Sequence, residues 1–530
     1  MSALFWDVVI IVLYFVIIIG IGLYMGRREE SMEDFALGGR KIPWWAVLAS
    51  IIAAETSAAT FLGVPAEGYR QQSALYVQLM FGTILARIII AYLFIKPYYH
   101  YQVYTVYEFL EKRFGAISRV AGSVIFLVTR VLASGVRVYI AAVVLVIAWK
   151  FLTGASPTFE QYLVAITIMT LITTIYTMLG GIKAVIWTDV IQASIMFGGA
   201  LLSLYLIVDL IPGGWEGIKA GTNNFANFKI FDTGLRDETT LYDAVLSIFR
   251  QEYTIWAAFT GYIFLVMATH GTDQDMVQRM LTATDYKRSR FSLILSGIAD
   301  VPIALAFVTI GIFLYAFFQI VPDPNLPRGA NGEVLTNEIF AYFIVNKMPP
   351  GLRGIIIAGV FATAMGSLSA ALNALATSFV KDFYTPYFKK NAGDKHYVSA
   401  ARVFTFVFAI LMILVAALSA YSVLHDPSLT IIPIALGIIG YTYGSLLGIF
   451  LIGMLTRTRG NDRGNLIAMF CGFLTVFVLS GLANKMLGWL GLAPIPIPHL
   501  AFTWYIMFGS IVTFLVGILF RTGKMLESAN

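Results

Sequence analysis

The sequence predicts an all-α, polytopic membrane protein with about thirteen transmembrane helices. Of the 530 residues, 58% are hydrophobic and only 12% are charged, whereas about a quarter of the residues of a typical soluble protein carry a charge. Apolar runs of about 20 residues, the length that crosses about 30 Å of hydrocarbon, recur along the whole chain. No soluble domain is evident at either end, so we expect a single transmembrane domain over residues 1–530.

The first apolar run begins with an acid, Asp7, and no small-residue cleavage site follows it, so we expect a retained helix and no signal peptide. A polar interval at 104–114 has the pattern of an amphipathic surface helix. The predicted spans lie near residues 6–25, 44–66, 75–97, 118–149, 159–178, 184–211, 251–276, 291–320, 351–376, 402–422, 430–453, 464–483 and 499–520.

Basic residues gather in alternate loops, which predicts the orientation of the chain. Clusters occur at 27–28, 40–41, 287–290 and 389–395, and all four fall on one side when the predicted spans alternate. We therefore expect a multi-pass protein of the cell membrane, embedded in the lipid bilayer, with the amino terminus outside and the carboxyl terminus cytoplasmic. The net charge of +6 follows from this bias and calls for no nucleic-acid partner.

The sequence lacks a phosphate-binding loop and a zinc-type cluster, which argues against ATP-driven proteins and against zinc proteins. The chain contains no Gly-rich phosphate-binding loop, so ATP is not expected to drive it. It has no cluster of His and Cys of the zinc type, and its single cysteine, Cys471, cannot form an intrachain disulfide. We predict that the protein is not an enzyme.

The predicted span at 44–66 carries the clearest functional signal. Glu55, Thr56, Ser57 and Thr60 lie in the middle of this apolar run. An ionisable side chain at that depth is costly, and a helix interrupted there frees carbonyl groups that can hold a cation. The alternative is a kinked packing helix in which Glu55 pairs with a neighbouring cation.

Each of the other polar residues inside the predicted spans can be interpreted either as a structural residue or as a functional one. Asp189 suits the first turn of a helix as well as an ion site, and His270 suits an interhelical hydrogen bond as well as a proton relay. The small residues and hydroxyls of 363–373 suit close helix packing or a wall that faces an ion. This set of polar residues consists of Gln78, Arg130, Arg137, Asp189, His270 and Asp300.

Arg130 and Arg137 are seven residues apart, so they share one helix face and lie about 10 Å from each other. A buried guanidinium needs an anion, which Glu55, Asp189 or Asp300 could supply, as could a carboxylate of a solute. Arg137 lies nearer the predicted outer half, where an arriving solute would meet it. It is therefore the better candidate for a solute ligand.

At these residues the sequence resembles the sodium:solute symporter family. The resemblance runs over nearly the whole chain and implies a leucine-transporter-like core of two inverted five-helix repeats, 44–211 and 251–453. The span at 6–25 would be an extra amino-terminal helix, and 464–520 would form two carboxyl-terminal helices. The motifs that carry the resemblance are 38–45, 53–57, 104–114, 180–192, 278–279 and 366–373.

The resemblance also implies sodium as the coupling ion. Its principal site would use the carbonyl groups of Ala53 and Thr56 with Thr363, Gly366 and Ser367. A hard cation prefers such oxygens. Many members carry two adjacent hydroxyl residues where this chain has Gly366 and Ser367, so one ligand would be a carbonyl only.

A second sodium would use Asp189 and Ser369. Other members have a serine where this chain has Ala370, so the sequence leaves open whether one or two ions bind.

The resemblance implies sodium-coupled symport of a small polar organic solute. A carboxylated solute such as a sugar acid or sialic acid is the first choice, and a neutral sugar or polyol is the second. The alternatives are a proton-coupled or uncoupled facilitator with Glu55 and His270 as titrating groups, and a sensor or channel on the same core. No oligomeric state is predicted. The candidate solute ligands are Glu55, Ser57, Thr60, Gln78, Arg137, Thr269, His270 and Asp300.

Overall fold

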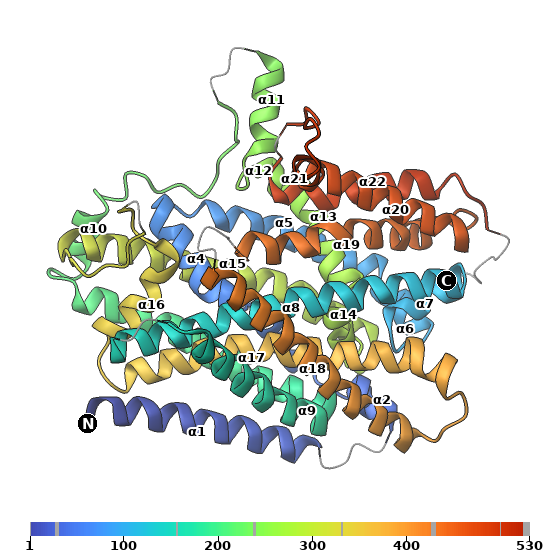
Figure 1. The fold of residues 1–530 in the computed structure, drawn as a ribbon, viewed down its shortest axis with the longest axis horizontal. Coiled ribbons are helices and arrows are strands. Elements are labelled where there is room, and N and C mark those ends of the chain that lie inside the picture. Colours follow the sequence, from blue (N-terminus) through green and yellow to red (C-terminus); the bar gives the residue numbers. More distant parts are fainter. Residues whose placement is uncertain are drawn as a thin grey trace.

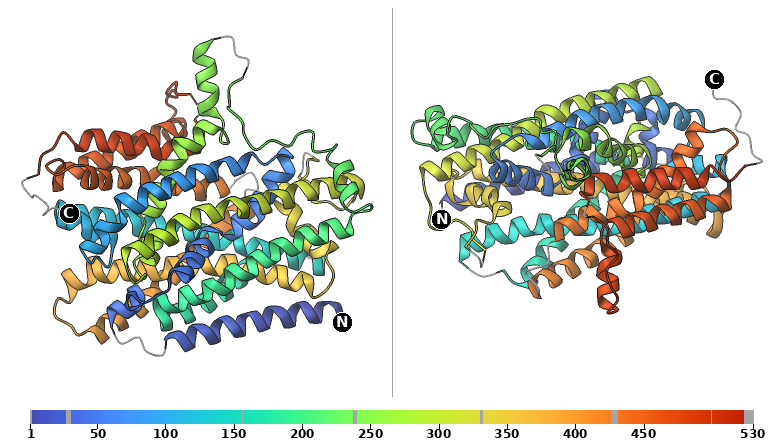
Figure 2. Two further views of the ribbon diagram at one scale, coloured as in Figure 1. Left: turned by 180° about the vertical axis from the view of Figure 1, so that it is seen from behind. Right: turned by 90° about the horizontal axis from the view of Figure 1, so that it is seen from above.

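Long helices lie roughly parallel along the longest axis of the molecule (Figure 1), an arrangement that is also visible from behind and from above (Figure 2). The computed structural model describes residues 2–26, 31–154, 157–236, 240–329, 332–425, 431–498 and 500–522. Within these ranges the chain forms helices and no β-strand. Parallel apolar helices are what a bilayer requires, because each helix satisfies its own backbone hydrogen bonds.

The helices appear in chain order with the following bounds: α1 (Ser2–Met25), α2 (Met32–Leu37), α3 (Trp44–Glu55), α4 (Ala58–Gln71), α5 (Gln78–Leu93), α6 (Ile95–His100), α7 (Val106–Arg113), α8 (Ala116–Thr153), α9 (Phe159–Leu210), α10 (Trp215–Gly221), α11 (Leu241–Arg250), α12 (Ile255–Phe259), α13 (Gly261–Gly271), α14 (Gln274–Met280), α15 (Tyr286–Ile320), α16 (Thr336–Lys347), α17 (Leu352–Phe379), α18 (Asp394–His425), α19 (Ile431–Leu455), α20 (Asp462–Leu479), α21 (Leu482–Trp489) and α22 (Tyr505–Gly517). Short 3₁₀ segments are η2 (Gly38–Arg40), η3 (Leu75–Val77) and η5 (Phe502–Trp504), and η4 (Val380–Phe388) is a π-helical extension of α17.

Nine helices of the described ranges are long and apolar enough to cross a membrane, or up to eleven if each of two bent pairs is one span. A total of thirteen requires α9 to count as two spans and the shorter apolar helix Phe502–Gly517 to cross as well. The 52 residues of α9 consist of two helices that meet at Gly181, and each of them is long enough for one span. The all-α membrane fold is thus confirmed, and the number of spans stays a prediction.

The predicted boundary between the spans at 159–178 and 184–211 falls at Gly181, where two helices that share the label α9 meet. Residues on both sides of this break contact α1, since Gly180 lies against Gly26 and Gln192 donates a hydrogen bond to Tyr14. The backbone of Gly181 has φ 47° and ψ −149°, a conformation that only glycine adopts without strain. The two apolar runs that the sequence predicts are therefore two helices, and Gly181 lies at the junction between them.

Two apolar helix pairs of the described ranges are sharply bent. The first break separates α3 from α4, whose axes differ by 62°. The second separates α11 from α12 and α13, with a bend of 67°, and the helix is interrupted again at Thr260. The helix predicted at 104–114 is present as α7, and its position at a membrane surface stays a prediction.

Helix α1 lies along one edge of the molecule (Figure 1) and packs against α9 and α17. Its Asp7 is buried, forms an ion pair with Arg353, and accepts hydrogen bonds from the backbone N–H groups of Gly351 (2.7 Å) and Gly354 (2.9 Å). These contacts fasten α1 to the amino-terminal end of α17. The division of the core into repeats at 44–211 and 251–453 stays a prediction.

The second half of the broken span, α4, approaches α15 closely. A Cβ atom added at Gly311 would overlap the carbonyl oxygen of Pro65, and one added at Gly68 would overlap the carbonyl oxygen of Val308. Small residues permit such close approach of two helices in a membrane. Two reciprocal glycines therefore set the distance between these helices.

We expect Gly311→Ala to destabilise the protein by about 1–3 kcal/mol, because the methyl group must push α4 away from α15. The apparent melting temperature in detergent measures this effect. Gly63→Ala is the matched control, since Gly63 also lies in α4 and no neighbouring atom lies within 4 Å of its added Cβ. Equal melting temperatures for the two variants would contradict the packing described here.

Candidate functional site

The break after α3 exposes backbone carbonyl groups in the middle of the protein. Helix α3 ends at Glu55, and Thr56 and Ser57 have extended backbone with ψ of 96° and 168°. The N–H of Thr56 still donates to the carbonyl of Ile52 at 3.1 Å. The later carbonyls of α3, including that of Ala53, have no helical donor because the helix has ended. The resemblance implies sodium ligands at the carbonyls of Ala53 and Thr56, which lie at this helix end, and that role stays a prediction.

Helix α17 brings the predicted sodium ligands to the same break. The hydroxyls of Thr363 and Ser367 donate to carbonyls of their own helix at 2.8 and 3.2 Å, which leaves their oxygen lone pairs available. The carbonyl of Ala53 lies 3.4 Å from the position that a Cβ of Gly366 would occupy. Ser369 donates to the carbonyl of Gly366 at 3.1 Å. The break and the hydroxyl-rich face of α17 are therefore in contact.

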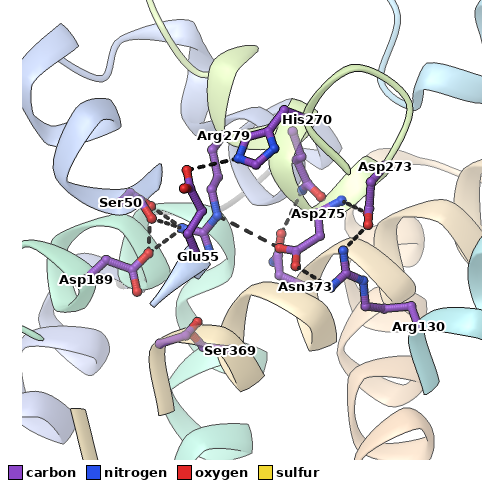
Figure 3. A network of polar contacts seen from close by, with 12 residues as sticks. Ser50, Glu55, Arg130, Asp189, His270, Asp273, Asp275, Arg279, Ser369 and Asn373 are labelled. Atoms are coloured by element: carbon purple, nitrogen blue, oxygen red, sulfur yellow. Dashed lines mark hydrogen bonds and ion pairs between the residues drawn. The ribbon is translucent and has the colours of Figure 1, made fainter. Parts of the chain in front are cut away.

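Asp189 reaches this place from α9. One of its carboxylate oxygens accepts a hydrogen bond from Ser50 at 2.6 Å and forms an ion pair with Arg279 (Figure 3). The other oxygen, Oδ1, has no hydrogen-bond partner among the described residues and lies 3.4 Å from the Cβ position of Gly366. Asp189 lies two turns beyond the kink at Gly181 and not in a first turn, so its position does not depend on the helix dipole.

A chain of buried ion pairs runs from this carboxylate to α8. Arg279 lies 3.9 Å from Asp275, which lies 3.2 Å from Arg130. Arg130 also forms an ion pair with Asp273, which accepts a hydrogen bond from Tyr443 at 2.7 Å. Figure 3 shows these side chains in one continuous network. The short helix α14 therefore connects Asp189 of α9 with α8, the helix that carries both arginines.

The anion of Arg130 is a correction to the sequence analysis. We expected Glu55, Asp189 or Asp300 inside the protein, or a solute, and the structure instead uses two acids of the α14 segment. Those acids lie at the end of a predicted span, where a charged residue is common and does not by itself indicate a function. The family motif at 278–279 was the available signal, because it marks the same segment.

Four predicted solute ligands gather around one residue that the sequence analysis did not select, Arg87 of α5. Its guanidinium forms an ion pair with Glu55 and another with Asp300 at 2.6 Å. His270 Nε2 lies 2.9 Å from Glu55 Oε1, and His270 Nδ1 lies 2.9 Å from the hydroxyl of Thr269. The alternative interpretation of Glu55, pairing with a neighbouring cation, is thus what the structure contains. An arginine in the middle of the apolar run 75–97 was the signal for this cation.

The remaining predicted solute ligands lie elsewhere. Ser57 caps α4, and its oxygen lies 3.5 Å from that of Thr60. Gln78 accepts a hydrogen bond from the backbone N–H of Asp232 at 3.2 Å, so it holds a loop that follows α10. Arg137 of α8 is half-buried and has no ion pair or hydrogen bond with the residues that the structure describes. Of the two arginines, only Arg130 forms ion pairs with described residues, while Arg137 interacts with the same two acids, Asp273 and Asp275, without an ion pair.

Broken helices and buried charges in a bundle of apolar helices are typical of a secondary transporter. Residues 35–472 match the model of the sodium:solute symporter family, so the chain belongs to this family. The protein therefore performs sodium-coupled transport of a solute and is not an enzyme. The all-α, leucine-transporter-like fold class follows as well.

Individual relatives cover most of the chain. The sodium/sialic acid symporter SiaT of Proteus mirabilis is 29% identical over 459 residues, which are 86% of this chain and 86% of that protein. The human sodium-coupled monocarboxylate transporter 1 is 28% identical and covers 88% of this chain and 72% of its own length. A solved structure, described as the substrate-bound outward-open state of a sodium-coupled sialic acid symporter with a novel sodium site, has a TM-score of 0.80, 26% identity, and covers 98% of this chain and 99% of its own.

We expect Arg87→Ala to destabilise the fold by about 3–5 kcal/mol, because Glu55 and Asp300 would lose the cation that neutralises them in the interior. Expression of folded protein and the melting temperature in detergent measure this. Arg70→Ala is the control, since the pair of Arg70 with Glu67 is solvent-exposed and contributes about 0–1 kcal/mol. A normal melting temperature for Arg87→Ala would mean that the cluster does not stabilise the fold.

Proposed function

We propose that the protein carries a small carboxylated solute, such as sialic acid or another sugar acid, into the cell together with sodium. The observation that supports this solute class is the guanidinium of Arg137, which is half-buried in α8 and forms no ion pair or hydrogen bond with a described residue. A guanidinium in that position needs an anion, and a carboxylate matches it with two parallel hydrogen bonds. The hydroxyls of Ser57 and Thr60 and the amide of Gln78 would orient the rest of the solute.

The names of two relatives agree with this solute class. Sialic acid and the monocarboxylates have one chemical feature in common, a carboxylate. The protein that resembles this chain over 98% of its length is also described as a sialic acid symporter. Glu55, Thr269, His270 and Asp300 would border the solute site on the side of α13 and α15, with Arg87 holding the two acids in place.

We further propose that sodium binds between the break and α17, held by the carbonyls of Ala53 and Thr56 and by oxygens of Thr363, Gly366 and Ser367. The ion would tie the first half of the broken span to α17 and so favour one conformation of the protein. Linkage then requires sodium to raise the affinity for the solute and the solute to raise the affinity for sodium. Asp189 and Ser369 remain the ligands for a second ion, if the transport cycle moves two.

We place the protein in the cell membrane with the amino terminus outside and the carboxyl terminus cytoplasmic. Helices α10 and α16 lie at the end of the molecule where α1 begins, and α2 and α7 lie toward the opposite end (Figure 1). The basic clusters at 27–28 and 40–41 flank α2. This agrees with the excess of positive charge that cytoplasmic loops carry. Maleimide labelling of cysteines introduced into α10 and α7, from one side of intact cells, tests the assignment.

Uptake into proteoliposomes tests the transport proposal. We expect labelled sialic acid, or another sugar acid from a panel, to accumulate when a sodium gradient is imposed and not when potassium replaces sodium. Accumulation driven by a proton gradient alone would support a proton-coupled carrier. Equilibration without accumulation would indicate a facilitator, binding without transport a sensor, and uptake of neutral sugars or polyols alone would exclude the carboxylated class.

We expect Arg137→Lys to raise the solute concentration for half-maximal uptake about tenfold, because lysine keeps the charge but loses the two-pronged contact with a carboxylate. Uptake kinetics at saturating sodium measure this change. Arg70→Lys, at an exposed position, is the control. Unchanged kinetics for Arg137→Lys would remove Arg137 from the solute site.

We expect Ser367→Ala to raise the sodium concentration for half-maximal uptake about tenfold, since a charged partner of a hydroxyl loses roughly 1.5–3 kcal/mol when the hydroxyl is removed. Sodium titrations of uptake provide the measurement. Ser378→Ala is the matched control, because Ser378 is a buried hydroxyl of the same helix without a hydrogen-bond partner among the described residues. If the sodium dependence of the two variants is equal, Ser367 is not a ligand.

A further inference from the structure

A groove lies on the surface of the molecule between the start of α8, the end of η4 and the start of α20. Its volume is about 420 Å³, and α8 packs against both of the other elements. Helix α8 begins directly after α7, so the groove lies toward the end of the molecule where Figure 1 shows α7. The side chains that line the groove are those of Ala116, Ile117, Val120, Ala121, Tyr387 and Leu466.

The lining of the groove is apolar except for one phenol. Ile117 and Leu466 are exposed, and Tyr387 is 60% exposed, as is the neighbouring ring of Phe388 at 71%. Aliphatic side chains at the surface of a membrane bundle contact acyl chains, and tyrosine is enriched at the level of the lipid headgroups. An acyl chain therefore matches the groove, with its headgroup on the side of Tyr387.

Basic side chains without a partner flank the groove on two sides. Lys389 and Lys390 follow the two exposed rings of η4, and Arg463 lies three residues before Leu466 on the same face of α20. All three are exposed, and none forms a side-chain hydrogen bond or ion pair with a residue that the structure describes. Basic residues beside a groove between membrane helices bind anionic lipid headgroups.

The acids around the groove do not neutralise these basic residues. Asp462 accepts hydrogen bonds at 2.7 and 3.1 Å from two backbone N–H groups in the first turn of α8. Asp382 and Glu111 both form ion pairs with one arginine of α8. In the segment 389–395, Asp394 is the only acid beside three lysines. The rim of the groove therefore carries a net positive charge.

We propose that this groove binds an anionic phospholipid of the cytoplasmic leaflet. One acyl chain lies along the apolar lining, and Lys389, Lys390 and Arg463 bind the phosphate. Because the lining residues come from α8, α20 and the extension of α17, the bound lipid stabilises the packing of these three elements. This site is separate from those proposed for solute and sodium, and its existence does not depend on which solute is carried.

The test compares two lipids by their effect on the melting temperature of the purified, delipidated protein in detergent. Dioleoyl phosphatidylglycerol is anionic, and dioleoyl phosphatidylcholine has the same chains and no net charge. We expect phosphatidylglycerol to give half-maximal stabilisation at a concentration at least about tenfold lower, since each basic residue near an anionic headgroup strengthens binding roughly fivefold.

A triple variant with Lys389→Gln, Lys390→Gln and Arg463→Gln removes the headgroup ligands and leaves the apolar lining intact. We expect it to respond to both lipids at the same concentration. Lys485→Gln is the matched control, because Lys485 is also exposed and has no side-chain partner among the described residues. It lies in α21, beyond the far end of α20, and its loss should leave the preference for phosphatidylglycerol unchanged.

Val120→Trp places a large ring in the groove and leaves the basic residues in place. We expect this variant to lose the stabilisation by phosphatidylglycerol, because the acyl chain has no room. If Val120→Trp does not fold, the triple variant decides. Equal responses of the unchanged protein to the two lipids, or an unchanged preference in either variant, would overturn the proposal. Native mass spectrometry that shows a lipid-free dimer, separated by Val120→Trp, would instead assign the groove to a second copy of the chain.

Discussion

A backbone carbonyl in the interior of a membrane protein must have a partner, and the end of α3 at Glu55 leaves several carbonyls without one. This constraint explains why α9 and α17 close around the break. Gly366 lets α17 approach the carbonyl of Ala53, and Asp189 of α9 arrives at the same place. A cation bound there would coordinate the carbonyls that have lost their helical donors. An interrupted helix can therefore couple the binding of an ion to a conformational change.

The buried charges divide into two groups by whether the protein pairs them. Arg87 neutralises Glu55 and Asp300 and so connects α3, α5 and α15. Arg130 is likewise satisfied by two acids of the α14 segment. Groups that are fully paired hold helices together, because removing either partner leaves an uncompensated charge. One oxygen of Asp189 has no hydrogen-bond partner among the described residues, and Arg137 forms no ion pair with them, so these are the groups that the proposal assigns to an ion and to a solute.

Helix α14 links the two regions. Arg279 contacts the carboxylate of Asp189, and Asp275 lies between Arg279 and Arg130. Arg130 is two turns from Arg137 on the same face of α8. The connected ion pairs thus extend from Asp189, a proposed ion ligand, to Arg130, two turns from the proposed solute ligand Arg137. Such a set gives a physical route for reciprocal effects of ion and solute on each other's affinity, whose size a double-mutant cycle would measure.

Local pattern alone determined most of the architecture. Apolar length predicted the spans, polar residues in the middle of 44–66 predicted a break, and amphipathic periodicity predicted α7. These features depend on residues that are close together in the chain, so one sequence without an alignment is enough to predict them. The tertiary structure decided which charges pair, because pairing depends on distances between helices. Glu55 and Arg87 are 32 residues apart, and Asp189 and Arg279 are 90 apart. No local pattern could therefore distinguish the satisfied groups from the unsatisfied ones.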